Sequence, residues 1–385
     1  MKRAPIEVTA LLERDASPPD PWSLRALPAL EAVRPKAAVA NPAAGRRGKF
    51  RARRVAIVGA TGNADQLLRK LQLCRGGPVS LLGVFDDQRP ALAAKACSSG
   101  ALAGMAVRPL DALIAEAQQS PPDIIVLALP PGEMAAIRVA LARLRALPAE
   151  IALLDDENSY PILVGRRSYL AGAPLRVLVE RPISRAGACV KRAMDVAVAL
   201  PVLAICAPLL LLIALAIALE SPGGVLFRQQ RIGFNNQPFT LLKFRTMIAD
   251  APDQEGALGT RRADPRVTRV GRVLRRFSLD ELPQLLNVLA GSMSIIGPRP
   301  HTRVMQIGEH PYAEAVPAYA QRHRMKPGLT GWAQVNGSRG GIHTLDKAAW
   351  AAAMDLEYVQ RWTLWLDLQI LLRTVGLVLS GRGAL

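Results

Sequence analysis

The sequence has few aromatic residues, few cysteines and few histidines, and each shortage narrows the range of functions. Phe, Trp and Tyr make up 4% of the 385 residues, so stacking platforms for single-stranded nucleic acid, and a nucleic-acid partner, are not expected. The four cysteines show no CxxC spacing, which is typical of reduced thiols in a cytosolic compartment. The four histidines form no zinc-binding motif, so a metal, where one binds, is expected to be a hard cation with oxygen ligands.

The charge is strongly unbalanced toward basic residues. A formal net charge of +18 favours anionic partners such as phosphates or acidic lipid.

A length of 385 residues allows two domains. Residues 1–50 are rich in Pro, Ala and Arg and are predicted to be a disordered segment. No apolar stretch follows Met1-Lys2-Arg3, so a secretory signal is not expected.

Residues 51–182 show short apolar, β-branched runs that alternate with helical stretches. This alternation predicts an α/β domain with a Rossmann-like, doubly wound parallel sheet. A helix is expected at residues 66–73, and another follows residues 130–133. The expected strands are residues 55–58, 79–85, 122–129 and 151–154.

The loop after the first expected strand is a loose variant of the dinucleotide-binding fingerprint. It places Gly59 and Gly62 in a G-x-x-G-x-A pattern, and Asp86 stands where a ribose-binding acid is expected. Neither Tyr160 nor Tyr169 is followed by the lysine of a Tyr-x-x-x-Lys pair. This disfavours a nucleotide-sugar oxidoreductase or epimerase. A structural or regulatory role for this domain is therefore preferred, with nucleotide binding as the alternative.

Residues 196–219 form an uncharged apolar run, VAVALPVLAICAPLLLLIALAIAL. An unbroken helix of this length would be ~36 Å long and would span a bilayer. Pro201 and Pro208 interrupt the run, however, and Pro208 is expected to kink the helix near its middle. Both flanks are also basic, which favours entry and exit on one face of the membrane. We predict a re-entrant helical hairpin at 193–220 that breaks at Pro208; a spanning helix and a buried core helix are the alternatives.

The stretch RRFSLDELPQLL at residues 275–286 places two adjacent carboxylates, Asp280 and Glu281, ahead of an apolar helical face. Either Ser278, in a capping box, or Asp280 is expected to be the N-cap. The acidic pair then lies in the first helical turn, where the helix dipole keeps carboxylates ionised and attracts phosphate. Plain helix capping is the structural alternative.

Basic and polar motifs lie on either side of the acidic pair. Residues 239–247 predict a strand with Lys243 and Arg245 on one face. Residues 297–300 read Gly-Pro-Arg-Pro, and residues 326–337 form a turn-rich polar cluster. Residues 364–373 predict either an interfacial amphipathic helix or a core helix.

In this order, and together with Lys191-Arg192-x-x-Asp195, these motifs resemble the bacterial sugar transferase family, the monotopic polyprenyl-phosphate phosphoglycosyl transferases. The resemblance covers residues 185–385, and it implies that 183–385 is a membrane-embedded, α-rich α+β catalytic domain behind the Rossmann-like domain. Related proteins often have Ser-Pro at the hairpin break, whereas this chain has Ala207-Pro208.

The resemblance implies a particular reaction. A sugar-1-phosphate passes from a nucleotide-diphospho-sugar, for which a UDP-hexose is expected, to undecaprenyl phosphate. Asp280 would be the nucleophile that carries the phospho-sugar, and magnesium would bridge Asp280 and the diphosphate. Glu281 would act as a base or help to orient the metal. The step would begin exopolysaccharide, capsule, O-antigen or glycoconjugate synthesis.

The resemblance also implies where the substrates bind and where the protein works. Phosphate clamps are expected at Lys243, Arg245, Arg275 and Arg299. The nucleotide or sugar pocket is expected at Trp332, Gln334 and Asn336. The protein is expected on the cytoplasmic face of the bacterial inner membrane, in contact with the lipid bilayer. A non-catalytic membrane-binding protein is the rival interpretation, and the sequence leaves open whether the chain forms a homo-oligomer.

Overall fold

The computed structural model describes residues 52–73, 79–87, 100–130, 132–155, 165–248, 264–307, 310–316, 318–338, 340, 342 and 344–379. All of these residues belong to one contact-defined unit, Lys49–Leu385. The predicted disorder of residues 1–50 lies outside the described residues. The expected domain boundary after residue 182 stays a prediction.

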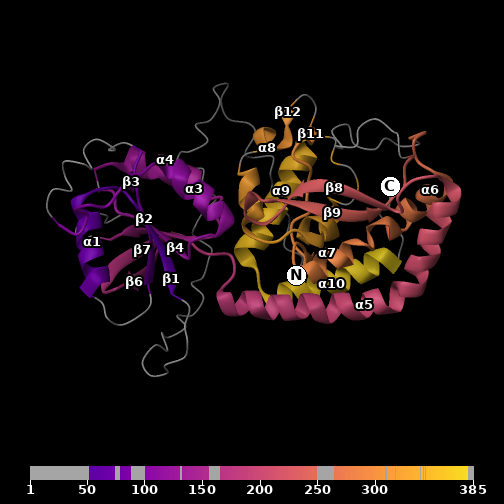
Figure 1. Ribbon diagram of the computed structural model, residues 1–385, viewed down its shortest axis with the longest axis horizontal. Coiled ribbons are helices and arrows are strands. Elements are labelled where there is room, and N and C mark those ends of the chain that lie inside the picture. The colour runs from indigo at the N-terminus through magenta and orange to yellow at the C-terminus, as the bar shows by residue number, and fades with distance from the viewer. Residues whose placement is uncertain are drawn as a thin grey trace, which may run out of the picture. The chain divides into compact units, whose positions relative to one another are not determined.

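The N-terminal part of the described chain is built on a seven-stranded sheet (Figure 1). The strands of its parallel part lie in the order β3-β2-β1-β4-β5. The chain therefore winds outward in both directions from the β1–β4 pair, and the four expected strands are all present. Their bounds are Arg53–Val58 (β1), Val79–Phe85 (β2), Val107–Arg108 (β3), Ile124–Leu127 (β4) and Glu150–Leu154 (β5).

Successive side chains of a strand point to opposite faces of its sheet, so the apolar strand β1 contributes to a core on each face. Helices cover both faces and close these two cores. Val55 and Ile57 pack with α1 (Gly62–Leu73) in one core, whereas Ala56 and Val58 pack in the other. The second core is closed by α3 (Leu110–Gln119) and α4 (Met134–Leu144). The sequence did not predict the antiparallel pair β6 (Arg166–Leu170) and β7 (Ala173–Val179), which extends the sheet beyond β5.

The apolar run lies in a single helix, α5, which extends over Arg185–Glu220 and contains both Pro201 and Pro208. Of the described helices, α5 alone is long and apolar enough to cross a membrane. Only 11% of its most apolar 18-residue stretch is buried. Such low burial argues against the core-helix alternative and is compatible with membrane association. The helix is continuous through the expected hairpin at 193–220, including the expected break at Pro208. Figure 1 nevertheless shows the ribbon of α5 changing direction as it passes from α10 toward α6.

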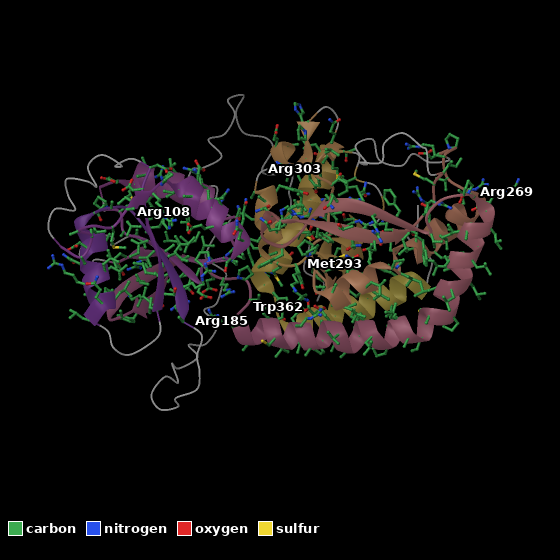
Figure 2. All side chains as sticks on the ribbon, viewed as in Figure 1. Arg108, Arg185, Arg269, Met293, Arg303 and Trp362 are labelled. Carbon is green, nitrogen blue, oxygen red and sulfur yellow. The ribbon has the colours of Figure 1, made fainter. Side chains whose placement is uncertain are left out.

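The C-terminal half packs around α5, the β-hairpin β8–β9, and the helices α7, α9 and α10. The core of this half includes the fully buried Met293 (Figure 2). Short segments connect the larger elements. The bounds are Leu226–Ile232 (β8), Phe234–Asn236 (η4), Pro238–Phe244 (β9), Arg269–Arg276 (α6), Leu279–Glu281 (η5), Gln284–Ala290 (α7), Ser294–Ile296 (β10), Gln306–Ile307 (β11), His310–Pro311 (β12), Tyr312–Ala315 (α8), Tyr319–Arg324 (η6), Gly328–Thr330 (β13), Gln334–Ser338 (η7), Leu345–Arg361 (α9) and Leu364–Leu379 (α10).

The Lys-Arg-x-x-Asp motif joins α5 to three other elements of this half. Lys191 forms a buried ion pair with Asp367 of α10, at 2.8 Å. Arg192 donates hydrogen bonds to carbonyl oxygens at the C-terminal end of α7, including that of Leu289 at 2.6 Å, where helix carbonyls lack partners. Asp195 accepts hydrogen bonds from the hydroxyl of Ser294 and the amide of residue 295, in β10. The motif thus fixes the segment that follows the acidic pair.

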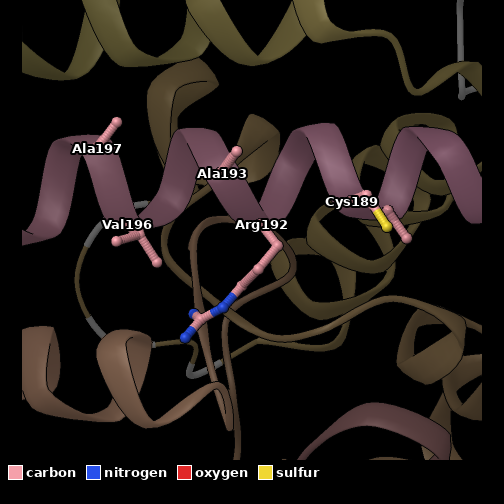
Figure 3. A pocket seen from close by; sticks show the side chains of 6 residues that line it. Cys189, Arg192, Ala193, Val196 and Ala197 are labelled. Atoms are coloured by element: carbon pink, nitrogen blue, oxygen red, sulfur yellow. The ribbon is translucent and has the colours of Figure 1, made fainter.

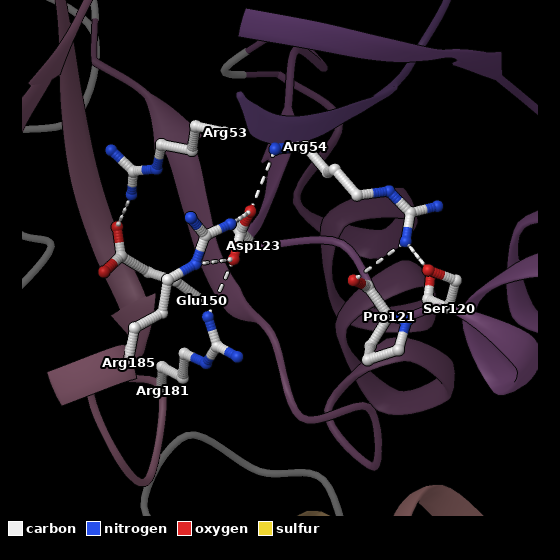
Figure 4. A network of polar contacts seen from close by, with 8 residues as sticks. All are labelled: Arg53, Arg54, Ser120, Pro121, Asp123, Glu150, Arg181 and Arg185. Atoms are coloured by element: carbon white, nitrogen blue, oxygen red, sulfur yellow. Dashed lines mark hydrogen bonds and ion pairs between the residues drawn. The ribbon is translucent and has the colours of Figure 1, made fainter. Parts of the chain in front are cut away.

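The start of α5 is attached to the N-terminal sheet through Asp123 (Figure 4). This carboxylate accepts hydrogen bonds from the amide of Arg54, at 2.9 Å, and from the side chains of Arg181 and Arg185. Although burial opposes it, these donors hold the pKa of Asp123 below its ordinary value.

The first turn of α5 also packs closely against Trp362. Gly187 faces the ring of Trp362, and a Cβ atom at Gly187 would lie 3.0 Å from Cζ3 of that ring.

Candidate active site

The acidic pair lies in the 3-10 turn η5, immediately before α7. Ser278, one of the two predicted N-caps, occupies the N-cap position of η5, but with φ 55° its side chain makes no capping hydrogen bond. Asp280, the other candidate, lies inside η5, and Pro283 occupies the N-cap position of α7. Pro283 has no amide to leave unpaired there, so the α-helix begins after it. The prediction that Asp280 and Glu281 lie in a helical turn holds, but the turn is tighter than an α-helix.

Glu281 is held by two cations that the sequence had singled out. Its Oε1 atom accepts hydrogen bonds from Lys243 Nζ at 2.8 Å and Arg299 Nη2 at 3.0 Å. Burial of the carboxylate raises its pKa, but Arg299 and Lys243 outweigh this effect and leave the pKa of Glu281 well below its ordinary value. Glu281 is therefore an ionised group that organises two cations, and a weak base.

Asp280 has the opposite electrostatic character. Its burial raises the pKa, Lys243 lowers it, and the neighbouring charge of Glu281 raises it again, so that the pKa of Asp280 lies above its ordinary value. No described hydrogen bond or ion pair occupies its carboxylate. Two adjacent carboxylates whose pKa values move in opposite directions are typical of groups with different catalytic tasks.

Arg275 lies beside Asp280 and is oriented by a residue that the sequence analysis did not single out. Its Nε atom donates a hydrogen bond to Thr246 Oγ1 at 2.8 Å. Burial lowers the pKa of Arg275, and the charge of Asp280 counteracts the effect. Asp264, which pairs with Arg266, is a second neighbouring charge. Thr246 belongs to the predicted strand at 239–247 but lies beyond the end of β9 at Phe244, and its contact with Arg275 depends on tertiary packing.

Arg245, in the same predicted strand as Lys243, has no described hydrogen bond or ion pair with the acidic pair. Its guanidinium is buried and donates to the carbonyl oxygens of Ser221 and Pro222, each at 2.7 Å, just beyond the C-terminal end of α5. The carbonyl groups at the C-terminal end of a helix have no backbone donor within the helix, and a cation placed there is favourable. The predicted strand had Lys243 and Arg245 on one face, but β9 ends at Phe244, so Arg245 lies beyond the strand and its guanidinium contacts the residues after α5.

Arg245→Ala is expected to lower the free energy of unfolding by about 2–4 kcal/mol, because buried carbonyls lose charge-assisted hydrogen bonds. The KM for the nucleotide-sugar that the resemblance implies is expected to change little. Thermal unfolding in detergent measures the first effect, with the exposed Arg228→Ala as the matched control. A 10-fold increase in KM with unaltered unfolding would instead assign Arg245 to substrate binding.

The three residues predicted to line the nucleotide or sugar pocket make contacts with one another, with β13 and with the helices α9 and α10. Trp332 Nε1 donates to Glu357 at 3.2 Å, and Arg373 lies over the Trp332 ring. Asn336 donates to the Trp332 carbonyl at 2.8 Å. Gln334 Nε2 lies 3.4 Å from the Leu329 carbonyl, and its Oε1 is buried without a hydrogen-bond partner in the described structure. No described hydrogen bond joins these residues to the acidic pair, and their substrate role stays a prediction.

The glycine loop of the N-terminal sheet is stabilised by the acid that was expected to bind ribose. Asp86 Oδ2 accepts the amide of Ala60 at 2.8 Å, and Gly59 donates its own amide to the Phe85 carbonyl at 2.8 Å. Gly59 has φ 104°, and a Cβ there would lie 2.9 Å from Leu129. Gly62 begins α1. These contacts are those of a structural loop; nucleotide binding stays a prediction.

The donor set at the acidic pair suits magnesium that arrives with a diphosphate. No group of three or more His, Cys, Asp or Glu side chains able to hold a metal is found among the described residues. Magnesium is commonly bound by one or two carboxylates together with substrate phosphates and water. Asp280, whose carboxylate has no described hydrogen bond, fits that pattern.

A shallow cavity of about 720 Å³ lies elsewhere, along the first turns of α5 (Figure 3). It is lined by Ala188, Cys189, Arg192, Ala193, Val196 and Ala197. The acidic pair and its cations do not line it. The Arg192 guanidinium at its edge is already hydrogen-bonded to α7.

The described residues thus combine an acidic pair next to three cations with a long, exposed apolar helix. This combination is expected of a membrane-associated enzyme with an anionic substrate. The family model described as "Bacterial sugar transferase" matches residues 186–381. The chain belongs to this family.

Relatives with assigned names agree with the family. The chain is 39% identical over 340 residues to an "Undecaprenyl-phosphate glucose phosphotransferase" of Komagataeibacter xylinus, covering 86% of this chain and 60% of the relative. It is 35% identical over 326 residues to a "UDP-glucose:undecaprenyl-phosphate glucose-1-phosphate transferase" of Escherichia coli (strain K12), covering 85% and 68%. A protein of that name from Caulobacter vibrioides is 53% identical over 196 residues, covering 50% and 71%. The chain thus spans between about three fifths and seven tenths of these relatives.

Proposed function

We propose that this protein transfers a sugar-1-phosphate from a UDP-hexose, with UDP-glucose the first substrate to test, to undecaprenyl phosphate. The observation that carries the proposal is the acidic pair, in which Glu281 is paired with two cations whereas Asp280 has no described hydrogen-bond partner. The family assignment and the names of the relatives support the same reaction.

In the first half-reaction, an oxygen of the Asp280 carboxylate attacks the sugar-bearing phosphorus. The new O–P bond forms as the bond from that phosphorus to the bridging oxygen breaks, and the nucleoside monophosphate leaves with the electron pair. In the second half-reaction, an oxygen of the lipid phosphate attacks the same phosphorus and releases the Asp280 carboxylate. Bound magnesium would neutralise diphosphate charge that otherwise repels the carboxylate.

The cations around the pair position charge for this reaction. Lys243 and Arg299 are fixed by Glu281, and Arg275 by Thr246, so each guanidinium or ammonium group is oriented before substrate binds. Preorganised cations stabilise the charge that develops on transferring phosphoryl oxygens. Arg245 takes no part, because its donors serve the residues that follow α5.

We also propose that α5 is re-entrant and that the N-terminal sheet is Rossmann-like. The two prolines inside α5 and its change of direction in Figure 1 support the first point. The strand order β3-β2-β1-β4-β5 supports the second. Apolar side chains exposed on α5 and α10, including Leu211 and Trp365, would lie in the lipid. The catalytic half then works at the cytoplasmic face of the inner membrane.

Cysteine labels on the two sides of α5 are expected to be protected together in intact cells. Tyr169→Cys and Arg303→Cys are exposed positions for such labels in a variant without the four native cysteines. Both should react with an impermeant maleimide only after permeabilisation. Labelling of one site from the periplasm would establish a spanning helix.

Pro208→Leu restores the missing hydrogen-bond donor and should therefore shift the population toward the spanning topology.

The function itself is tested by release of nucleoside monophosphate. Purified protein with magnesium, UDP-glucose and undecaprenyl phosphate should release UMP and form a lipid-linked sugar phosphate. A nucleotide-sugar oxidoreductase or epimerase would change the sugar and leave the diphosphate intact, and a non-catalytic membrane protein would do neither. Other UDP-hexoses, supplied singly, identify the sugar.

A further inference from the structure

One short helix, η6, contacts both the active-site segment and the N-terminal sheet. Arg322, in η6, is 1% exposed and forms an ion pair with Asp355 of α9. It also donates hydrogen bonds to the carbonyl oxygen of Arg299, at 2.7 Å, and to His301 Nδ1, at 2.6 Å. The backbone of the residue that pairs with Glu281 is therefore held from η6.

Arg324, two residues further along η6, points to the N-terminal sheet. Its buried guanidinium donates to three carbonyl oxygens: those of Leu147 at 3.0 Å, Ala149 at 3.1 Å and Glu180 at 2.6 Å. Burial lowers the pKa of Arg324 to about 10, so the side chain still carries its charge at neutral pH. A buried charge that loses its hydrogen-bond partners is strongly unfavourable. The position of η6 thus depends on the N-terminal sheet being in place.

A second contact between the same two parts arises from the turn η4. Asn235, which is buried and has φ 58°, donates from Nδ2 to the carbonyl oxygens of Ala117 at 2.6 Å and Gln118 at 3.0 Å. Both carbonyls belong to the last turn of α3, where helix carbonyls lack internal partners. The next residue, Asn236, lies with Oδ1 2.6 Å from Nδ1 of His323 in η6. The contact from α3 therefore also reaches η6.

We propose that the N-terminal sheet and its helices are a positioning element of the transferase site, and that Arg324 and Asn235 are its positioning residues. The segments next to the sheet hold η6 directly through Arg324, and α3 holds it indirectly, through Asn235 and its neighbour Asn236. In turn, η6 holds the Arg299 carbonyl through Arg322, and Arg299 then meets Glu281 at the acidic pair. This inference rests on the proposed function, because the quantity that it affects is the rate of phospho-sugar transfer.

The test uses the full-length chain and the burst of UMP release on mixing with UDP-glucose and magnesium without lipid. The burst amplitude counts correctly folded sites, and the burst rate constant reports how well those sites are arranged. Arg324→Ala should lower the rate constant by about 10-fold at nearly full amplitude. Asn235→Gly removes the amide but keeps a residue that accepts positive φ, and should lower the rate constant by about 3-fold or more. Arg324→Lys should restore much of the rate, because an ammonium group supplies three donors for three carbonyls.

Arg176→Ala is the matched control, because Arg176 pairs with Asp155 at 2.9 Å wholly inside the N-terminal part. Its rate constant should stay within 2-fold of wild type. Unchanged rate constants in Arg324→Ala and Asn235→Gly, whatever their amplitudes, would show that the contacts are merely structural. If Arg324→Ala does not fold, Asn235→Gly decides alone. A wild-type protein that releases no UMP even with lipid present would overturn the proposed function rather than this inference.

Discussion

Asp280→Asn is expected to yield a folded, membrane-bound protein whose transfer rate is lower by at least ~10³-fold. The amide has almost the size of the carboxylate but lacks the anionic oxygen that attacks phosphorus. Asp280 caps no helix and has no described hydrogen-bond partner, so the exchange should cost little stability. Steady-state UMP release with lipid present measures the loss.

The control is Asp346→Asn, which makes the same chemical change in the first turn of α9, on an exposed residue. Its rate should stay within 2-fold of wild type. If Asp280→Asn keeps more than about a tenth of the wild-type rate, a loss below ~1.4 kcal/mol, then Asp280 is not the nucleophile.

Glu281→Gln is expected to slow the first half-reaction by ~10²-fold. A neutral amide oxygen cannot hold both Lys243 and Arg299, so the two cations lose their fixed positions. The low pKa of Glu281 makes it a weak base, so we expect positioning, rather than proton transfer, to account for the loss. The burst of UMP release without lipid measures this half-reaction.

The pH profile of the same variant separates the two roles. Asp280 must be ionised to attack, so the burst rate should fall as the pH is lowered through its raised pKa. The charge of Glu281 contributes to that rise, so Glu281→Gln should lower the pKa of Asp280 and move the acid limb to lower pH. A limb that vanishes, or that moves to higher pH, would contradict the assignment of the limb to Asp280.

The sequence predicted those parts of the fold that local pattern determines. The strand at 79–85 has the predicted bounds, because a mainly apolar run ends in two acidic residues. The pair β6–β7 was missed, because Arg166 and Arg167 lie in β6 and break the apolar pattern of a strand. The capping prediction placed Ser278 correctly before the acidic pair, but Ser278 is the N-cap residue of a 3-10 turn rather than of an α-helix. Its left-handed conformation leaves its side chain without a capping hydrogen bond, which the capping-box pattern did not predict.

The candidate site was predictable to the extent that its residues lie in motifs. Lys243 and Arg299 were chosen from a strand and a Gly-Pro-Arg-Pro turn, and both meet Glu281. Arg245 was chosen on the same strand pattern, but its position follows from the packing of α5. Arg322 was missed because it lies in a 3-10 helix without clear periodicity, and its importance arises from a carbonyl 23 residues away in the sequence.

The most direct test of the account is the mass of the protein after brief mixing with UDP-glucose and magnesium, without lipid, followed by acid quench. The account predicts a gain equal to one hexose phosphate, located on the peptide that contains Asp280, and its loss when undecaprenyl phosphate is added before the quench. UMP release that requires the lipid, with no change in protein mass at any time, would contradict the covalent intermediate at Asp280.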